Sequence, residues 1–167
     1  MNVLFRHMTK DDWDSVSEIY REGIETGHAT FEKDIPTWYE WNNGHLERCR
    51  IIAEVEHEIV GWAALSPVSR RPVYAGVSEV SVYISEKHKG QKTGTRLLEK
   101  LILESENEGI WTLQASIFRE NRASLKIHEN LGFRQVGYRE KIGKMNGIWR
   151  DTILLERRSK KVGVGEI

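Results

Sequence analysis

The sequence predicts a single-domain α/β protein in which helices flank a mixed β-sheet. The chain has 167 residues, a length that suits one domain with a full hydrophobic core. Amphipathic helical segments alternate with short β-type runs along the chain. An Asn146-Gly147 pair between the last two runs is typical of a β-hairpin turn. We therefore expect strands at first, then a β-α-β-α-β-β order that closes the sheet.

The first half of the chain shows clear helix and strand signals. Thr9 can cap a helix whose apolar residues, Trp13, Val16 and Ile19 among them, fall on one stripe. Thr37 and Glu40 have the spacing of a capping box, which starts a second, shorter helix. We expect helices at residues 9–26 and 37–46, strands at 4–7, 51–55 and 59–65, and a loop at 68–76.

The second half alternates strands with helices and ends in the hairpin. Gly109 and Gly132 follow helical segments and are expected to end them. We expect strands at residues 79–84, 111–118, 133–141 and 148–155, and helices at 95–107 and 122–131. No repeat or long linker divides the chain, so we assign residues 1–157 to one domain. Residues 158–167 are polar and contain glycine, and we expect a disordered C-terminal tail there.

Composition narrows the possible functions. Lys plus Arg and Asp plus Glu both number 25, and this balance argues against a nucleic-acid binder. No apolar run approaches the roughly 20 residues that span a bilayer, and the N-terminus lacks a secretory apolar core. Cys49 is the sole cysteine, so no cysteine cluster can hold zinc and no intrachain disulfide can form. The histidines lack metal-binding spacing. We expect a cytoplasmic, metal-free protein without a membrane segment.

A basic turn between a strand and a helix is the most informative feature. A β-type run ending at Ile84 enters a turn that contains Lys87, Lys89 and Lys92 and leads directly into a helix. The first N–H groups of a helix lack intrahelical partners and lie at its positive end, where anions bind. The turn is neither a Walker A loop nor a dinucleotide fingerprint. It predicts a phosphate or pyrophosphate site, and a surface turn with solvated lysines is the alternative.

Together with residues 121–133, this turn resembles the two signature motifs of the GCN5-related N-acetyltransferase (GNAT) superfamily. The family turn reads R/Q-x-x-G-x-G/A, and Lys89, Lys92 and Gly94 occupy its defined positions. Lys92 replaces the first glycine, so either a non-helical backbone is not needed there or the lysine turns outward toward phosphate. Further segments follow the order seen in phosphinothricin and methionine sulfoximine acetyltransferases: Ala29-Thr30-Phe31, Trp38 with Trp41, residues 79–83 and 128–133, and Gly147-x-Trp149-x-Asp151.

The resemblance implies a GNAT fold, acetyl-CoA as co-substrate and a homodimer. The pyrophosphate would be bound by Lys89, Gly90, Gln91, Lys92, Thr93, Gly94 and Thr95. Backbone groups of Val82, Tyr83 and Ile84 would bind the pantetheine arm, and one N–H there would polarise the thioester carbonyl. Asn121 and Ser124 would bind the lower part of the cofactor. Asn121 can also be a simple helix N-cap, and the two roles are compatible.

Glu79, His128 and Tyr83 are the candidate catalytic residues. Strand alternation places Glu79 and Tyr83 on the face opposite Val80 and Val82. Glu79 is either a general base, directly or through water, or the ion-pair partner of an arginine such as Arg71. His128 occupies the helical position where many family members have a tyrosine that protonates the leaving thiolate. It can act as acid or base, or it can be a buried core histidine.

The expected acceptor is a small amino-acid-like amine. Arg71 and Tyr74 lie where the resembled subfamily binds an anionic head group, which suits a bidentate guanidinium, and Phe31 would wall the pocket. Ser69 and Phe118 depart from that pattern and weaken the case for phosphinate. The implied reaction is N-acetylation of phosphinothricin, methionine sulfoximine or methionine sulfone by direct attack in a ternary complex. Another small amine, such as a polyamine, an aminoglycoside or a protein amine, and a non-catalytic CoA sensor are the alternatives.

Overall fold

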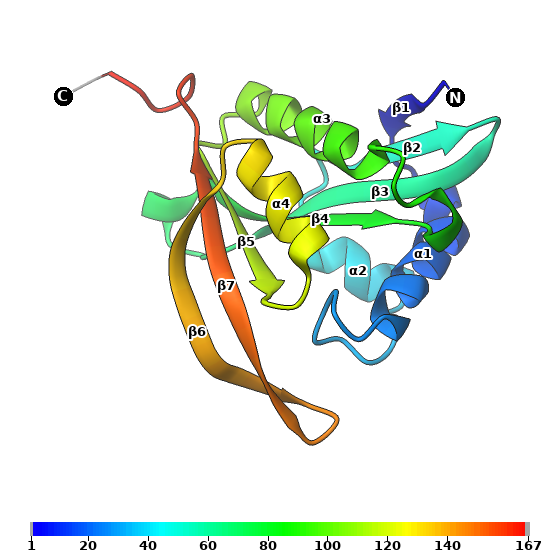
Figure 1. Ribbon diagram of the computed structural model, residues 1–167. Helices are drawn as coiled ribbons and strands as arrows, with labels where there is room; N and C mark the ends of the chain where they lie inside the picture. Colours follow the sequence, from blue (N-terminus) through cyan, green and yellow to red (C-terminus); the bar gives the residue numbers. More distant parts are fainter. Residues whose placement is uncertain (1, 166–167) are drawn as a thin grey trace.

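The computed structural model describes residues 2–165 and contains one sheet of seven strands in the order β1-β2-β3-β4-β5-β7-β6 (Figure 1). The strands are β1 (Leu4–His7), β2 (Ile51–Val55), β3 (Glu58–Pro67), β4 (Val77–Ile84), β5 (Thr112–Phe118), β6 (Arg134–Met145) and β7 (Ile148–Arg158). The helices are α1 (Trp13–Glu25), α2 (Trp38–Gly44), α3 (Thr93–Asn107) and α4 (Arg122–Asn130). Three 3-10 turns add η1 (Lys10–Asp12), η2 (Pro72–Tyr74) and η3 (Glu86–His88). The predicted α/β fold with a mixed sheet is confirmed.

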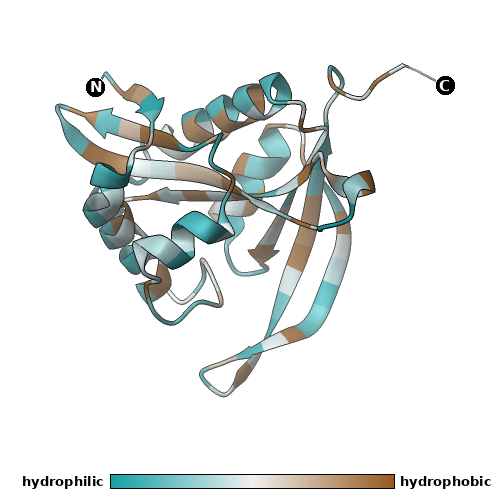
Figure 2. Ribbon diagram, turned by 180° about the vertical axis from the view of Figure 1, so that it is seen from behind, coloured by the Kyte–Doolittle hydropathy of each residue, from teal (hydrophilic) through white to brown (hydrophobic). Residues whose placement is uncertain are grey.

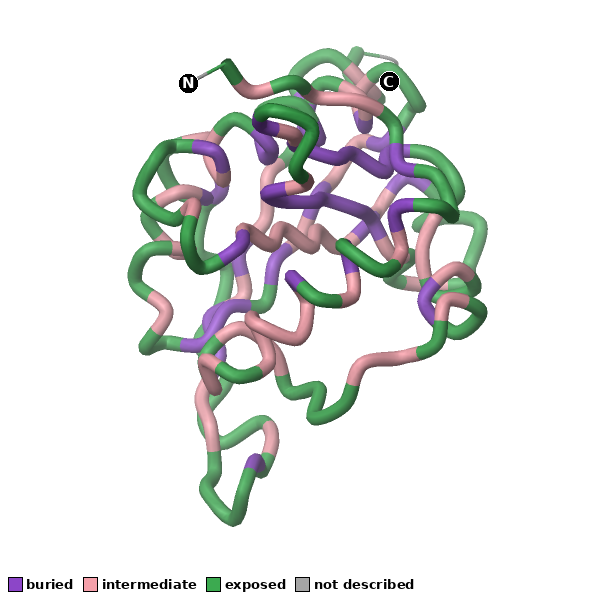
Figure 3. Tube along the Cα trace, turned by 90° about the vertical axis from the view of Figure 1, so that its right-hand side faces the viewer, coloured by how far each residue is buried: buried purple, intermediate pink, exposed green. Residues whose placement is uncertain are grey.

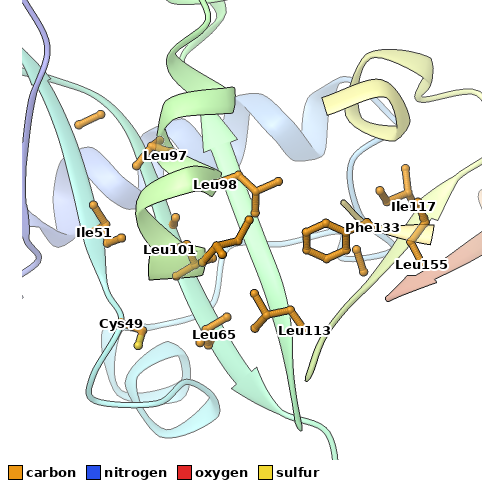
Figure 4. Close-up of a cluster of buried hydrophobic side chains, with 14 of the residues drawn as sticks. Cys49, Ile51, Leu65, Leu97, Leu98, Leu101, Leu113, Ile117, Phe133 and Leu155 are labelled. Atoms are coloured by element: carbon orange, nitrogen blue, oxygen red, sulfur yellow. The ribbon is translucent and has the colours of Figure 1, made fainter. Parts of the chain in front are cut away.

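Each face of the sheet buries its own apolar cluster, because side chains alternate along the strands. Leu97, Leu98 and Leu101 of α3 pack on one face, which α4 also covers (Figure 4). On the other face, Val16 of α1 and Trp41 of α2 pack against strand residues of β2 and β3. The sheet therefore forms the middle of three layers, and its buried strands lie between exposed helix surfaces (Figure 3).

Strands β4 and β5 run parallel and pair over only a short stretch. Their register joins Val77 to Thr112 and Glu79 to Gln114, and no β4–β5 pair follows within residues 2–165. Every other pair of neighbouring strands is antiparallel and longer. The two strands thus separate beyond Glu79, and the backbone of residues 80–84 keeps hydrogen-bonding groups on the side that faces β5.

The hairpin of β6 and β7 projects beyond the body of the molecule (Figure 1). Asn146 and Gly147 form its predicted turn with φ angles of 51° and 78°, as a two-residue hairpin of the favoured hand requires. Strand β6 was expected to end at residue 141 but continues to Met145. A bulge interrupts the pairing with β7 between Arg139 and Gly143, and pairing resumes from Gly143 to Met145.

The described structure extends past the domain boundary expected at residue 157. Strand β7 includes Arg158, and the Ser159 hydroxyl donates to a Glu106 carboxylate oxygen at 2.5 Å. Arg158 donates to the carbonyl oxygens of Val162 and Gly163. Residues 166–167 of the expected tail lie outside the described range.

Candidate functional site

The gap between β4 and β5 contains a cavity of about 280 Å³. Strand β4 supplies one wall, strand β5 the other, and α4 and the loop after α1 complete it. Its lining residues are Ala29, Thr30, Phe31, Glu79, Val80, Ser81, Val82, Tyr83, Ala115, Ser116, Ile117, Phe118, Asn121, Ser124, His128 and Thr152. Because β4 and β5 separate, a cavity forms between them. Phe31, Glu79 and His128, which are distant in the sequence, line this same cavity.

Glu79 lies at the point where the two strands separate. It is half-buried, and its Oε1 accepts a hydrogen bond from the Gln114 amide, with Nε2 at 3.4 Å. The ion pair with Arg71 that the sequence left open is not among the salt bridges of residues 2–165. A carboxylate that faces a cavity without a cationic partner can accept a proton from a bound molecule.

His128 is buried on α4 and presents one ring nitrogen without a protein partner. Its Nδ1 lies 2.7 Å from the carbonyl oxygen of Ser124, a distance that requires Nδ1 to carry the proton. Its Nε2 is buried and has no hydrogen-bond partner among residues 2–165. Burial lowers the pKa of His128, and the Ser124 hydrogen bond opposes this shift. The neutral imidazole thus offers a lone pair, and as a base it fits the cavity better than as an initial acid.

Tyr83 lines the cavity, and its ring lies among other aromatic rings. Its ring stacks on Trp62 at 4.9 Å between centroids and meets Tyr20 in a tilted arrangement at 5.0 Å. Burial raises the pKa of Tyr83, Tyr20 adds to that shift, and a hydrogen bond with Thr30 opposes it. The phenol therefore stays protonated across the physiological pH range.

The turn before α3 has the backbone geometry of an anion-binding site. Gly90 and Lys92 both adopt left-handed conformations, with φ of 79° and 63°. The N–H groups of residues 90–95 donate no backbone hydrogen bond in the described structure, whereas the N–H of Arg96 donates to the Lys92 carbonyl. Such a row of free donors at a helix start suits a phosphate.

Lys92 differs from its two lysine neighbours in the turn. Lys89 pairs with Glu86 at 2.6 Å and Lys87 pairs with Glu58, whereas Lys92 forms no ion pair within the described range. The left-handed φ of Lys92 also shows that the glycine-like backbone is retained at this motif position. The alternative that a non-helical backbone is not needed there is therefore wrong, and the outward turn of the lysine toward phosphate stays a prediction.

Asn121 caps α4 and also ties the helix start to the loop after α1. Its Oδ1 accepts from the Ser124 N–H at 3.2 Å, and its Nδ2 donates to the His28 carbonyl at 3.2 Å. The N-cap alternative is therefore correct as far as it goes, and both Asn121 and Ser124 also line the cavity. Their cofactor role stays a prediction.

Arg71 and Tyr74 are not brought to the cavity. Both are exposed around η2, where the Arg71 guanidinium lies 5.5 Å from the centre of the Tyr74 ring. Phe31, in contrast, lines the cavity and meets Phe118 edge-on at 4.7 Å between centroids. Arg71 and Tyr74 do not line the cavity of a single chain, and their substrate-binding role stays a prediction.

Sequence reasoning gave no site role to several polar residues in or beside the cavity. Thr30, Ser116 and Thr152 line the cavity, and Gln114 contacts Glu79. Gln114, Ser116 and Thr152 owe their places to strand pairing, which a single sequence does not specify. Thr30 lies in a segment that was singled out only for its likeness to the family.

Cys49 lies away from the cavity, in the core beneath α3 (Figure 4). Burial, together with Glu104 and Glu108, raises the pKa of its thiol to about 12, so it has no thiolate at neutral pH. Residues 2–165 contain no group of three or more His, Cys, Asp or Glu side chains placed to hold a metal. In the same range no helix is long and apolar enough to cross a membrane.

Comparison with known proteins agrees with this geometry. Residues 13–133 match the Acetyltransferase (GNAT) family. The chain is 31% identical over 160 residues to a phosphinothricin N-acetyltransferase from Streptomyces viridochromogenes, covering 93% of this chain and 87% of the relative. It is 26% identical over 160 residues to an L-methionine sulfoximine/L-methionine sulfone acetyltransferase from Salmonella typhimurium, covering 92% and 93%. A phosphinothricin acetyltransferase structure from Sinorhizobium meliloti in complex with AcCoA superposes with a TM-score of 0.88 at 27% identity, covering 99% and 93% of the two chains.

Proposed function

This chain belongs to the GNAT acetyltransferase family and is an acetyl-CoA-dependent N-acetyltransferase, and we propose that its acceptor is the α-amine of a small amino-acid-like molecule. Phosphinothricin, methionine sulfoximine and methionine sulfone are the leading acceptors. The observation that carries the proposal is that Glu79 and His128 line one cavity. Glu79 accepts a hydrogen bond from Gln114, and the buried Nε2 of His128 has no hydrogen-bond partner within residues 2–165.

Acetyl-CoA fits the groups that the fold leaves without partners. The free N–H groups of residues 90–95 and the Lys92 side chain would hold the pyrophosphate. The unpaired edge of β4 at residues 82–84 would hydrogen-bond the pantetheine arm, which enters between β4 and β5. In this pose the thioester supplies an activated carbonyl beside the cavity that Glu79 and His128 line.

The proton acceptors in the cavity suit direct attack. In the proposed reaction Glu79 removes a proton from the acceptor ammonium group, directly or through water, and the free amine attacks the thioester carbonyl. The new C–N bond leaves a second proton on nitrogen, which His128 Nε2 accepts and passes to the departing thiolate as the C–S bond breaks. A backbone N–H of β4 would stabilise the oxyanion.

A covalent acetyl-enzyme finds no support in the cavity. Cys49 does not line it. Ser124 Oγ lies 3.5 Å from His128 Nδ1, but that nitrogen donates its proton to a carbonyl and cannot act as the base for the hydroxyl. We therefore propose a ternary complex, in which initial velocities with varied acetyl-CoA and acceptor give intersecting rather than parallel double-reciprocal lines.

The lining of the cavity also favours an amino acid over a polycation. Glu79 is the one acidic side chain among the described lining residues, and a polyamine or an aminoglycoside would need several. Phe31 and Phe118 would pack against the apolar arm of the acceptor. Protein amines and a CoA-sensing role without catalysis remain the competing functions, and the presence of both Glu79 and His128 speaks against a sensor.

The proposal also includes a homodimer and a cytoplasmic location. Tyr138, Ile142, Ile148 and Trp149 are all more than half exposed on the projecting hairpin, whose apolar segments appear brown in Figure 2. A second copy that covered these side chains would remove apolar surface from water. The cytoplasmic assignment follows from the single, reduced Cys49.

Thiol release from acetyl-CoA in the presence of a panel of amines tests the proposal. We expect release with methionine sulfone, methionine sulfoximine or phosphinothricin at a kcat/KM well above that for spermidine, an aminoglycoside or an N-terminal peptide. Preference for a polyamine, an aminoglycoside or a peptide would replace the acceptor assignment.

A further inference from the structure

The loop between α1 and α2 lines the cavity, and the β6–β7 hairpin contacts this loop. Ala29, Thr30 and Phe31 of this loop line the cavity. Gly143 of β6 and Arg150 of β7 face each other as a cross-strand pair, and both contact the loop. This pair lies far from the loop in sequence and outside the set of residues that line the cavity.

Arg150 fixes the start of the loop. Its Nη1 donates to the Gly27 carbonyl at 2.8 Å, and its Nη2 lies 2.9 Å from His28 Nδ1. Its guanidinium also lies 4.2 Å from the centre of the Phe118 ring. The Arg150 side chain is only 11% exposed, and its contacts connect the loop to Phe118 at the end of β5.

Gly143 sets the position of Phe31 by having no side chain. A Cβ on Gly143 would lie 2.7 Å from Cε1 and Cζ of the Phe31 ring, closer than real contacts allow. The φ of Gly143 is not in the left-handed region, so the requirement for glycine is one of space. The ring is thus confined between Gly143 behind it and Phe118, 4.7 Å away, beside the cavity.

The bulge in β6 brings Gly143 to this place. The register shifts between Arg139 and Gly143, and Lys141 within the bulge has a left-handed φ of 48°. The N–H of Lys141 donates to Asp151 Oδ1 at 2.7 Å, which anchors the bulge to β7. Asp151, the last residue of the Gly-x-Trp-x-Asp segment, therefore stabilises the bulge that places the Gly143 backbone against the Phe31 ring.

We propose that Gly143 is a specificity-determining position, which lets Phe31 stand back from the cavity and so sets the width of acceptor that fits beside Glu79. The inference rests on the proposed function. A methyl group at position 143 pushes the ring toward Phe118 and into the acceptor space. Acceptors with a branched or tetrahedral head, such as methionine sulfone, then lose more than narrow ones such as unbranched amino acids.

Gly143→Ala tests the proposal, and Gly137→Ala is its matched control. Gly137 lies on the same strand and beside another register shift, but a Cβ there meets nothing within 4 Å. We expect Gly143→Ala to lower kcat/KM for methionine sulfone at least tenfold, mainly through KM, with KM for acetyl-CoA within twofold of wild type. Gly137→Ala should match wild type in kcat/KM and KM for methionine sulfone and in KM for acetyl-CoA.

Rescue separates steric positioning from a general loss of structure. In the Gly143→Ala background, Phe31→Leu removes the ring that the methyl group contacts, and we expect it to recover most of the lost kcat/KM for methionine sulfone. Equal acceptor KM values for Gly143→Ala and Gly137→Ala would overturn the proposal. So would a double variant no better than Gly143→Ala, including the case in which Gly143→Ala fails to fold and Phe31→Leu does not restore it.

The test also distinguishes failure of the proposed function. If wild-type protein acetylates no amine in the panel, the proposed function fails, and the crystal structure of Gly143→Ala alone decides the positioning. A Phe31 ring displaced toward Phe118 would support the role of Gly143. A ring that keeps its place would overturn it.

Discussion

The side-chain amide of Gln114 donates to the carboxylate of Glu79 across the last residue pair that joins β4 to β5, with 3.4 Å between Nε2 and Oε1. The strands separate immediately beyond this pair. The contact therefore holds the carboxylate at the edge of the cavity, where a neutral amide can orient it without neutralising its charge.

Glu79→Gln should reduce turnover while leaving the shape of the site intact. We expect kcat to fall on the order of 10²-fold, because a positioned general base contributes about that much, with KM for acetyl-CoA unchanged. Steady-state kinetics at several pH values measure both. Glu99→Gln on the exposed surface of α3 is the control, and turnover equal to that control would remove Glu79 from the mechanism.

His128 should act in its neutral form, and its pKa is lowered by burial. Loss of the Nε2 lone pair on protonation then lowers kcat as the pH falls through the shifted pKa, so this acid limb lies below the ordinary value of about 6.5. His128→Gln should remove that component of the pH–rate profile and lower kcat. His57→Asn, in an exposed turn with a left-handed φ of 67°, is the control.

The same shift predicts a pH-dependent stability. The unfolded chain binds a proton at the ordinary histidine pKa, whereas folded His128 resists it, so acid favours the unfolded state. As the pH falls from 7 to 5, the unfolding free energy of wild type should decrease relative to that of His128→Gln. Urea unfolding at both pH values measures the difference, and a constant difference would contradict the lowered pKa.

Lys92→Gly restores the usual motif residue at a left-handed position. A non-glycine residue pays roughly 1–2 kcal/mol for that conformation, and glycine costs about 0.4–1 kcal/mol in chain entropy. We expect the variant to be as stable as wild type or more stable by about 1 kcal/mol. Thermal unfolding without ligand tests this, and a clear loss of stability would show that the side chain of Lys92 supports the turn.

The charge of Lys92 should matter less than the backbone groups around it. Calorimetric titration should find acetyl-CoA affinity of Lys92→Gly within tenfold of wild type, or about 1.4 kcal/mol, with a weaker salt dependence. A much larger loss would make Lys92 a principal phosphate ligand.

The projecting hairpin should mediate the proposed homodimer. We expect wild type to sediment as a dimer and Trp149→Glu to dissociate it, because a buried, unpaired carboxylate in an apolar interface is costly. Tyr39→Glu, on α2 and 72% exposed, is the control. A monomeric wild type would remove the dimer from the account.

Features with a local physical cause could be predicted from the sequence. The capping box of Thr37 and Glu40 forms, with the Glu40 N–H donating to Thr37 Oγ1 at 3.2 Å, and the Asn146-Gly147 turn closes the hairpin. The basic turn predicted the N–H groups before α3 that donate no backbone hydrogen bond. Alternation along β4 predicted that Val80 and Val82 pack on one face and Tyr83 on the other, and the roles of these site residues stay predictions.

Features that depend on contacts between distant residues could not be predicted from the sequence. The separation of β4 from β5 creates the cavity, and no local pattern encodes it. The hydrogen bond from Arg150 to Gly27 and the contact of Gly143 with Phe31 depend on the cross-strand pair of Gly143 and Arg150, which follows a bulge in β6. Arg71 was assigned from the resemblance to the subfamily, which does not show whether this loop reaches the cavity.

Thiol release from acetyl-CoA, followed for wild type and Glu79→Gln with methionine sulfone as acceptor, tests the central claim most directly. We expect stoichiometric release of CoA and N-acetylated acceptor by wild type, and about 10²-fold slower release by Glu79→Gln despite equal acetyl-CoA binding in calorimetry. Acetyl-CoA binding without acceptor-dependent thiol release by wild type, or equal rates for the two proteins, would contradict it.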